Sequence, residues 1–313
     1  MEKRRIGSLH VSVVGLGCNN FGWRLDADAT AKVVHAALDA GVNFLDTADM
    51  YGDTKSEEYL GKALRGRREQ AVVATKFGMK VDDQRHGAKP AYVRQAAEDS
   101  LRRLGTDYID LYQLHQPDPE TPIAATLAAL DELVKAGKVR EIGCSNFSAQ
   151  QIREAEAALR SGGARFVSVQ NEYSLLHRDP EREVLPECER RRLALLPYFP
   201  LANGLLTGKY RAGHPAPQGT RISTQERFGK LLNQHNLKMV EGLIGFAESR
   251  GHTILELAFS WLLAHPVVAS VIAGATSEQQ VRSNAGAAGW KLTPADLAEV
   301  DRILSQPLLS EAS

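Results

Sequence analysis

The sequence has few cysteines and no long hydrophobic run. Its 313 residues include three cysteines, Cys18, Cys144 and Cys188, and neither their odd number nor their spacing is typical of a disulfide framework. This composition indicates a reducing compartment, and we expect an intracellular, cytoplasmic protein. No stretch approaches the roughly 18 apolar residues that a membrane-spanning helix needs. The N-terminal segment is charged and lacks the apolar core of a signal peptide, so we expect neither secretion nor membrane insertion.

An excess of charge of one sign is also lacking. Lys plus Arg and Asp plus Glu both number 38, so the formal net charge is zero at pH 7. Surfaces that bind nucleic acid or anionic membranes carry a strong positive excess, and we therefore expect neither as a main partner. Pairs of Cys or His at the short intervals of zinc sites are missing too, so we expect no metal site. The sequence indicates no oligomeric state.

Short apolar runs alternate with amphipathic helices along the whole chain. The apolar runs predict strands at 13–17, 42–46, 71–76, 109–114, 141–144, 166–170, 193–196 and 268–272. Such alternation requires a parallel sheet covered by helices. Eight units in about 300 residues favour one α/β domain over residues 1–313, a (β/α)8 TIM barrel, rather than two doubly wound domains. We also expect a short N-terminal hairpin around Gly7 and a long irregular loop, about 201–225, after strand seven.

Capping residues predict where several helices begin and end. Asp28 is the expected N-cap of the first helix, and Gly41 is expected just beyond its C-terminus, where glycine tolerates a left-handed conformation. Ser148 is expected to cap the helix that follows strand 141–144. Further helices are expected near 91–104, 123–136, 181–192, 235–249, 253–264 and 294–305.

Polar side chains stand at the C-terminal ends of three successive predicted strands. Asp46 ends one strand and Tyr51 follows it after a polar turn, while Lys76 and His115 end or follow the next two strands. The C-terminal ends of barrel strands meet at one rim, so we expect these residues to lie together. Each residue taken alone also fits a structural role, such as an ion pair or a core histidine.

The same residue types are suited to carbonyl reduction. Tyr51 would protonate the carbonyl oxygen, and the charge of Lys76 would lower the pKa of the phenol. Asp46 would hold Lys76 in place. His115 would donate a hydrogen bond to the carbonyl oxygen, as in an oxyanion hole.

This set resembles the catalytic tetrad of the aldo-keto reductases, and other motifs resemble the same family over almost the whole chain. The segment Gly15–Gly22 fails the dinucleotide-binding pattern, with Asn20 where the third glycine belongs, but resembles the family's first βα loop. Gly143-Cys144-Ser145-Asn146-Phe147 lacks the last glycine of a nucleophile elbow and resembles the family's G-x-S-N-F motif. Segments 200–210 and 272–284 resemble its two later cofactor motifs.

The resemblance implies an NADP-dependent oxidoreductase that reduces aldehydes or ketones to alcohols by hydride transfer. Its cofactor would be NADPH/NADP+ and its partner a small-molecule carbonyl substrate. The cofactor-binding residues implied are Gly17, Ser145, Asn146, Gln170, Tyr198, Pro200, Leu201, Gly204, Leu206, Gly208, Lys209, Arg221, Gly274, Thr276, Gln280 and Asn284. The substrate pocket implied comprises Trp23, Tyr51 and His115.

Several of these residues have a specific task in the family. Ser145, Asn146 and Gln170 would bind the nicotinamide carboxamide, and Tyr198 would stack on the ring. Lys209 and Arg221 would hold the 2′-phosphate, whereas Gln280 and Asn284 would approach the adenine. The chain also departs from the family's pattern: Phe199 replaces a usual serine, and Ala273 and Glu278 replace prolines.

Two other functions remain open at this point. Potassium-channel β subunits share the barrel and the nucleotide site but are regulatory binding partners, and fold alone does not distinguish them from enzymes. His115, at a position where those subunits have an asparagine, and the lack of an N-terminal inactivating extension favour an enzyme. The other alternative is an unrelated barrel enzyme that binds no nucleotide. The sequence names no substrate.

Overall fold

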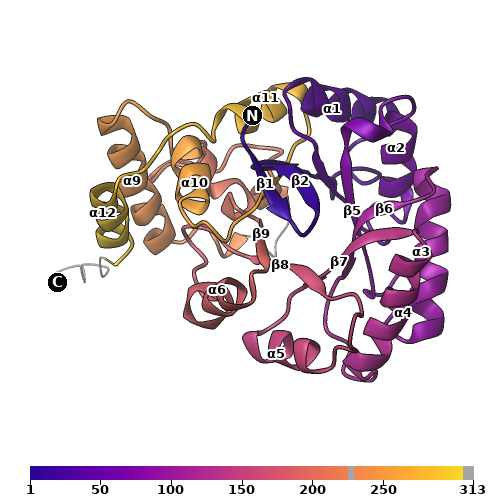
Figure 1. Ribbon diagram of the computed structural model, residues 1–313. Helices are drawn as coiled ribbons and strands as arrows, with labels where there is room; N and C mark the ends of the chain where they lie inside the picture. Colours follow the sequence, from indigo (N-terminus) through magenta and orange to yellow (C-terminus); the bar gives the residue numbers. More distant parts are fainter. Residues whose placement is uncertain (225–228, 306–313) are drawn as a thin grey trace. The chain divides into compact units, whose positions relative to one another are not determined.

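Eight parallel strands form a barrel in the computed structural model, which describes residues 1–224 and 229–305, apart from the side chains of Arg221 and Thr224 (Figure 1). The strands are β3 Val14–Gly17, β4 Phe44–Asp46, β5 Val72–Phe77, β6 Ile109–Leu114, β7 Val139–Ser145, β8 Phe166–Glu172, β9 Ala194–Tyr198 and β10 Val271–Gly274. Their order in space is β10-β3-β4-β5-β6-β7-β8-β9, and a parallel bridge between Leu195 and Val268 joins the two ends. The predicted (β/α)8 barrel is confirmed.

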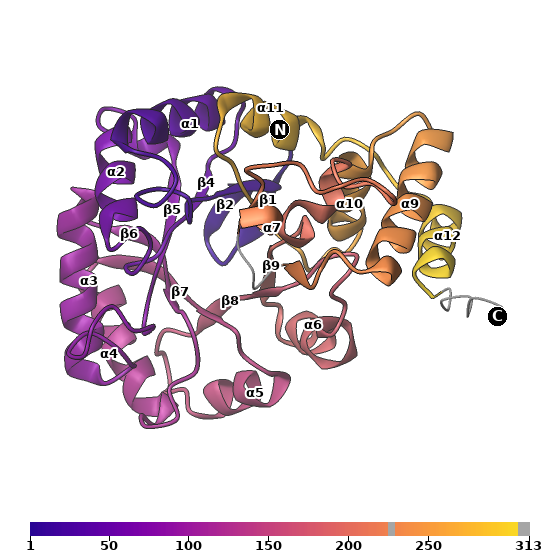
Figure 2. The same ribbon diagram turned by 180° about the vertical axis from the view of Figure 1, so that it is seen from behind.

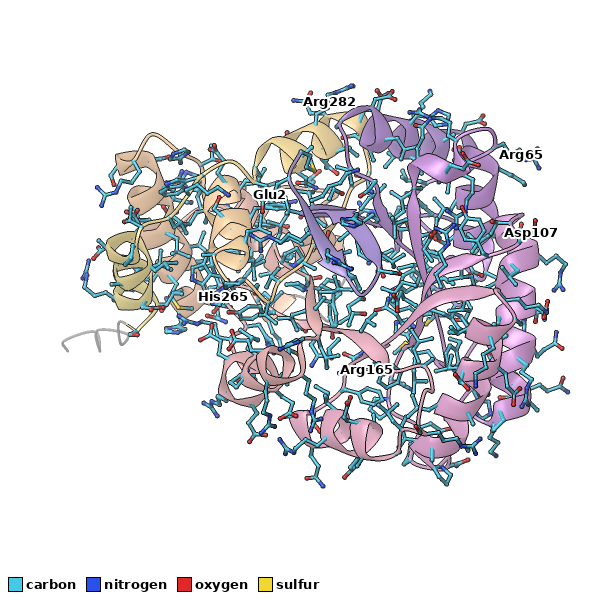
Figure 3. All side chains as sticks on the ribbon, viewed as in Figure 1. Glu2, Arg65, Asp107, Arg165, His265 and Arg282 are labelled. Carbon is cyan, nitrogen blue, oxygen red and sulfur yellow. The ribbon has the colours of Figure 1, made fainter. Side chains whose placement is uncertain are left out.

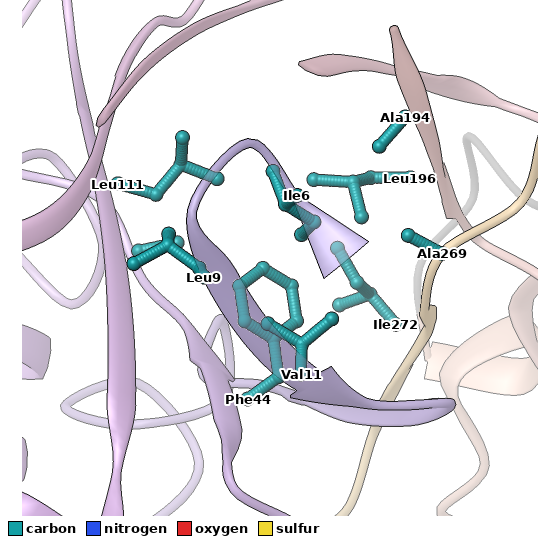
Figure 4. Close-up of a cluster of buried hydrophobic side chains, with 10 residues drawn as sticks. Ile6, Leu9, Val11, Phe44, Leu111, Ala194, Leu196, Ala269 and Ile272 are labelled. Carbon is teal, nitrogen blue, oxygen red and sulfur yellow. The ribbon is translucent and has the colours of Figure 1, made fainter. Parts of the chain in front are cut away.

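An antiparallel hairpin of β1 (Lys3–Ile6) and β2 (Leu9–Ser12) precedes the barrel, as predicted. Its apolar side chains are buried against residues of the barrel strands, in a cluster that Figure 4 shows with the side chains pointing toward one another. The members of this cluster are Ile6, Leu9, Val11, Phe44, Ala74, Leu111, Ala194, Leu196, Ala269 and Ile272. The hairpin therefore supplies part of the barrel's hydrophobic core.

Helices follow most of the strands and lie outside the barrel in both views (Figures 1 and 2). They are α1 Ala27–Asp39, α2 Lys55–Ala63, η1 Arg68–Gln70, α3 Pro90–Leu104, α4 Ile123–Lys135, α5 Ala149–Ala157, α6 Pro180–Arg191 and α11 Glu278–Gly286. Charged side chains such as those of Arg65 and Asp107 point outward from this layer (Figure 3). Polar residues thus face outward, and the apolar faces of the helices cover the strands.

The capping predictions are partly confirmed. Ser148 accepts a hydrogen bond from the main-chain nitrogen of Gln151 and forms a capping box with it. Gly41 has a φ of +80° directly after the C-cap of α1, as predicted. The predicted N-cap Asp28 is wrong, because Asp26 holds that place and accepts a hydrogen bond from Ala29 N at 2.9 Å. Both aspartates fit the composition rule, and only the main-chain geometry selects one of them.

The chain contains two compact units. The first comprises residues 1–172, 180–198 and 267–285, and includes the barrel. The second comprises residues 173–179, 199–266 and the chain from residue 286 on. Its helical elements are η2 Ala202–Thr207, α7 Arg221–Thr224, α9 Gln234–Ser249, α10 Ile254–Leu263 and α12 Pro294–Leu304. The loop predicted at about 201–225 is therefore partly helical, and the single domain stays a prediction.

None of the helices within residues 1–224 and 229–305 is both long and apolar enough to cross a membrane.

We predict that Gly61→Ala destabilises the protein by about 1–3 kcal/mol, as overpacking typically does. A Cβ atom at Gly61 in α2 would lie 2.3 Å from the main-chain oxygen of Leu104, and main chain cannot turn aside as a flexible side chain can. Gly245→Ala in α9 is the control. Apart from its own stretch of α9, no atom of the described residues lies within 4 Å of its Cβ position, and alanine favours a helix by roughly 0.5–1 kcal/mol. Urea unfolding measures both variants. A midpoint for Gly61→Ala at or above that of the wild type would contradict this packing.

Candidate active site

The structure brings Asp46, Tyr51, Lys76 and His115 together at the C-terminal ends of β4, β5 and β6. Lys76 Nζ lies 2.7 Å from Asp46 Oδ2 and donates a second hydrogen bond, of 2.8 Å, to the carbonyl oxygen of Thr47. The same Nζ is 5.1 Å from the centroid of the Tyr51 ring, and the rings of Tyr51 and His115 are 5.8 Å apart. Parallel strands place these residues side by side because their C-terminal ends point the same way.

Lys76 keeps its charge although it is completely buried. Burial by itself lowers the pKa of a lysine, but the charge of Asp46, the electrostatic interaction with Tyr51 and hydrogen bonds with both outweigh it, so the pKa of Lys76 is raised above its ordinary value. A buried ammonium with a carboxylate partner is the arrangement in which such a charge is tolerated. The site therefore contains a fixed positive charge beside the phenol.

The pKa of Tyr51 is raised, which corrects the expectation that Lys76 lowers it. Burial raises the pKa of the phenol more than the charge of Lys76 and a hydrogen bond with Lys76 lower it. Lys76 has the expected influence, yet the net shift has the opposite sign. The sequence shows which charge is near Tyr51 but not how completely the hydroxyl is desolvated. At neutral pH the phenol is therefore protonated and able to donate its proton.

The pKa of His115 is shifted in the opposite direction to that of Tyr51, and burial is again the main cause. Burial, together with the charge of Lys76, holds the pKa of His115 well below its usual range. Its imidazole is therefore neutral at pH 7 and has one N–H donor. Nδ1 is buried without a hydrogen-bond partner among the described residues. A neutral imidazole beside a protonated phenol supplies hydrogen-bond donors for one oxygen atom without a second positive charge.

Two glutamine side chains hold the other oxygen of Asp46. Gln170 Nε2 donates to Asp46 Oδ1 at 2.9 Å, and Gln113 Nε2 lies 3.3 Å from the same atom. No role was predicted for Gln113 from the sequence. A signal was present, because Gln113 is two residues before His115 and alternate residues of a strand share a face. Gln113 is thus a polar residue on the face that Ile109 and Leu111 otherwise make apolar, and it points into the barrel with the histidine.

The residues expected to bind the nicotinamide form a hydrogen-bonded series at the same rim. Ser145 Oγ donates to the carbonyl oxygen of Gln170 at 2.8 Å. Asn146 Nδ2 donates to the carbonyl oxygen of His115 at 2.9 Å, and Tyr198 Oη donates to Asn146 Oδ1 at 2.8 Å. Asn146 has a φ of 62°, a left-handed conformation that asparagine tolerates better than most residues. The series links Tyr198 to His115 through Asn146.

The loops after β3 and β10 lie against each other beside this rim. Gly17 pairs with Gly274 in the parallel register of the two strands. A Cβ atom on Gly274 would lie 3.3 Å from both Asn19 Oδ1 and Asn20 Nδ2, so a larger residue would crowd this contact. Thr276 donates to Gln280 Oε1 through its main-chain nitrogen and its hydroxyl. Asn284 is buried.

Trp23 is the large exposed aromatic of this region. Its side chain is 52% exposed, and its ring centroid lies 6.1 Å from that of Tyr51 at an interplanar angle of 51°. An exposed indole beside a phenol is an apolar surface that a small organic molecule can contact. Its role in substrate binding stays a prediction.

The segment 200–210 belongs to the second unit. It includes Pro200, Leu201, Gly204, Leu206, Gly208 and Lys209 of the predicted cofactor site. Phe199, Ala202 and Asn203 all have positive φ angles, 51°, 45° and 57°. Non-glycine residues in this region are strained, and such strain is concentrated at functional sites. Lys209 Nζ would be 3.0 Å from a Cβ atom on Gly204, so this glycine makes room for the lysine. The Arg221 side chain lies outside the described residues.

Within residues 1–224 and 229–305, no cluster of three or more His, Cys, Asp or Glu residues is arranged to hold a metal ion.

The chain is similar to known proteins over nearly its whole length. A family model described as "Aldo/keto reductase family" matches residues 13–305. The aldo-keto reductase YhdN of Bacillus subtilis (strain 168) is 34% identical over 310 residues, which cover 96% of this chain and 92% of that protein. The uncharacterized oxidoreductase YqkF of the same bacterium is 35% identical over 294 residues, covering 92% and 91%. The solved structure of a glycerol dehydrogenase from Gluconobacter oxydans has a TM-score of 0.85 at 32% identity, covering 99% of this chain and 97% of that one.

A further buried carboxylate, Asp49, lies two residues before Tyr51 in the segment between β4 and α2. Its Oδ2 accepts a long hydrogen bond, 3.4 Å, from Tyr92 Oη. Burial raises the pKa of Asp49 to about 7, and the nearby charge of Glu57 acts in the same direction. Asp49 therefore titrates near neutral pH, which is unusual for an aspartate.

We predict that Asp49→Asn becomes more stable relative to the wild type as the pH rises from about 4 to 8. The pKa of Asp49 rises from 3.8 to about 7 on folding, so the folded state binds the proton more tightly, and wild-type stability falls as the pH rises through this range. Asparagine does not titrate. The difference in free energy of unfolding should grow by on the order of 3 kcal/mol. Denaturant unfolding at several pH values measures it, and a pH-independent difference would contradict the raised pKa.

Proposed function

The chain belongs to the aldo/keto reductase family, and we propose that it is an NADPH-dependent carbonyl reductase that converts an aldehyde or ketone to an alcohol. Family membership makes it an oxidoreductase of a family that uses nicotinamide cofactors and acts on small carbonyl compounds. The cofactor NADPH, the direction of the reaction and the roles of single residues are the proposal. The observation that carries it is the buried Lys76–Asp46 pair beside Tyr51 and His115.

Tyr51 is the proton donor in this proposal. Its hydroxyl is protonated at neutral pH, so it can transfer a proton to the oxygen of a reduced carbonyl group. The phenolate that remains is stabilised by the ammonium of Lys76, whose charge Asp46 keeps in place. The neutral His115 donates a hydrogen bond to the same oxygen and adds no competing acid.

The rim of the barrel offers groups that fit a nicotinamide cofactor. Asn146 and Gln170 present amide groups and Ser145 a hydroxyl, and these match the donor and acceptor of a carboxamide. The half-buried ring of Tyr198 would support the nicotinamide. When bound, the cofactor supplies the hydride, and the chain supplies orientation and electrostatics.

The remaining cofactor residues would hold the phosphates and the adenine of such a molecule. Lys209 and Arg221 would hold a 2′-phosphate, while Gln280 and Asn284 would contact the adenine. Main-chain nitrogens of glycine-bearing loops, such as the one around Gly204, can cradle phosphates.

The substrate is a small carbonyl compound that reaches Tyr51 and His115 past the exposed Trp23. The relative from Gluconobacter oxydans is named a glycerol dehydrogenase. Short polyols and their carbonyl forms therefore belong in the first assay, together with a reactive aldehyde such as 4-nitrobenzaldehyde. NADPH consumption followed by absorbance tests the proposal. Tight NADPH binding without turnover of any compound would favour a regulatory subunit of the potassium-channel β type.

We predict that Tyr51→Phe lowers kcat by about 10²–10⁴-fold and leaves NADPH affinity unchanged, because the phenol is the general acid. Steady-state kinetics measures kcat, and fluorescence quenching measures NADPH affinity. Tyr112→Phe is the matched control, since the buried Tyr112 hydroxyl has no hydrogen-bond partner within residues 1–224 and 229–305 and its ring stacks on Phe77 at 4.7 Å. The control should keep its kcat. A near-normal kcat for Tyr51→Phe, with chemistry limiting the rate, would exclude Tyr51 as the proton donor.

We predict a preference for NADPH over NADH that Lys209→Ala and Arg221→Ala weaken. A 2′-phosphate is nearly a dianion, and a hydrogen bond to a charged group contributes roughly 1.5–3 kcal/mol, so each loss should cost about ten- to a hundredfold in NADPH affinity. NADH affinity should change little. Lys135→Ala is the control, because Lys135 pairs with Asp131 on α4 and should affect neither cofactor. Equal wild-type affinities for the two cofactors would refute the assignment.

A further inference from the structure

We propose that Gln113 is a positioning residue that holds the carboxylate of Asp46, and through it the Lys76 ammonium, in the place that proton transfer from Tyr51 needs. The inference rests on the proposed function, because it concerns the same site. Gln113 lies on β6, two residues before His115, and its side chain is completely buried.

The two oxygens of Asp46 have separate partners. Oδ2 pairs with Lys76 Nζ at 2.7 Å. Oδ1 faces Gln170 Nε2 at 2.9 Å and Gln113 Nε2 at 3.3 Å. A carboxylate bound at one oxygen only can rotate about its Cβ–Cγ bond, whereas donors at both oxygens fix its plane. Asp46 can direct Lys76 toward Tyr51 only while this plane is fixed.

The orientation of the Gln113 amide follows from charge. Its Nε2 faces the carboxylate, and its Oε1 is buried without a hydrogen-bond partner in the part of the chain that the structure describes. The reversed amide would place a carbonyl oxygen against a negatively charged oxygen, which is repulsive. The observed orientation leaves one buried acceptor unsatisfied, which is unfavourable, and presents a donor to Asp46. Such a cost is unexplained if Gln113 only fills space.

The neighbouring strand leaves room for this side chain. A Cβ atom on Gly143 of β7 would lie 3.3 Å from Gln113 Cγ and 2.4 Å from Ser168 Oγ. Because Gly143 has no side chain, the Gln113 chain can pass it and reach Asp46. Gly143 of β7 therefore provides the space that the Gln113 side chain of β6 occupies.

Gln113 gains importance when Gln170 binds the cofactor. The proposed function has the Gln170 amide bind the nicotinamide carboxamide as well as Asp46. Of the two glutamine donors to Asp46 Oδ1, Gln113 is then the one that binds Asp46 without also binding the cofactor. Gln170 therefore contacts the cofactor, whereas the task of Gln113 is to keep Asp46 aligned.

The first test is Gln113→Met, which keeps the length of the side chain and removes the amide. We expect kcat to fall about tenfold with unchanged NADPH affinity, because a long hydrogen bond to a charged group lies at the low end of its range. Ser168→Ala is the matched control, since it removes a buried, unpartnered hydroxyl beside the same glycine without touching Asp46. Circular dichroism and thermal unfolding establish that both variants fold. Equal loss of kcat in both would mean that core packing, not Asp46, is the cause, and would overturn the inference.

A second variant keeps the test decisive if Gln113→Met folds poorly. Gln113→Glu has nearly the shape of glutamine, and a carboxyl group there donates a hydrogen bond to Asp46 only while it is protonated. We therefore expect the ratio of its kcat to that of the wild type to fall as the pH rises, since the ionised group repels Asp46. A constant ratio would contradict the inference.

The route through Asp46 is tested by a double-mutant cycle. Asp46→Ala removes the acceptor, so adding Gln113→Met to it should lower kcat by much less than tenfold. Additive effects would overturn the inference while leaving the proposed function intact. A wild-type protein that binds NADPH but turns over no carbonyl compound would instead refute the proposed function, and the inference would fall with it.

Discussion

The ion pair between Lys76 and Asp46 is the constraint on which the rest of the site depends. Both side chains are almost completely removed from water, and a buried charge without a partner is strongly destabilising. The pair is tolerated because adjacent parallel strands place the two groups 2.7 Å apart and because the carbonyl of Thr47 and two glutamine amides take up further hydrogen bonds. The barrel thus holds a positive charge beside a phenol at a fixed position.

The same exclusion of water sets the protonation states around that charge. Burial raises the pKa of Tyr51 and lowers the pKa of His115, so at neutral pH both side chains are uncharged. The positive charge of Lys76 lowers the pKa of both groups, so it favours the phenolate of Tyr51 and disfavours the imidazolium of His115. The result is one protonated phenol, one neutral hydrogen-bond donor and one permanent cation. That division of roles is what reduction of a carbonyl group requires.

Much of this arrangement could be predicted from residue types at strand ends. Asp46, Lys76 and His115 stand at the ends of apolar runs, and a parallel barrel brings such ends to one rim whatever the sequence between them. The role of Gln113 was not predicted, because the rule for barrels concerns residues at the C-terminal ends of strands and Gln113 lies within β6. The N-cap of α1 was assigned to Asp28 instead of Asp26, since two aspartates fit the same composition rule and only main-chain geometry separates them.

The sequence by itself determined the family, through the motifs that resemble it. It also determined the order of strands and helices and the residues that meet at the rim, because periodicity and strand direction are local properties that add up to a closed barrel. The tertiary structure alone decided the sign of the Tyr51 pKa shift, the two glutamine donors to Asp46 Oδ1 and the helical turns inside the segment 201–225. These properties depend on how completely an atom is desolvated and on which strands approach it, and neither quantity is encoded within a short stretch of residues.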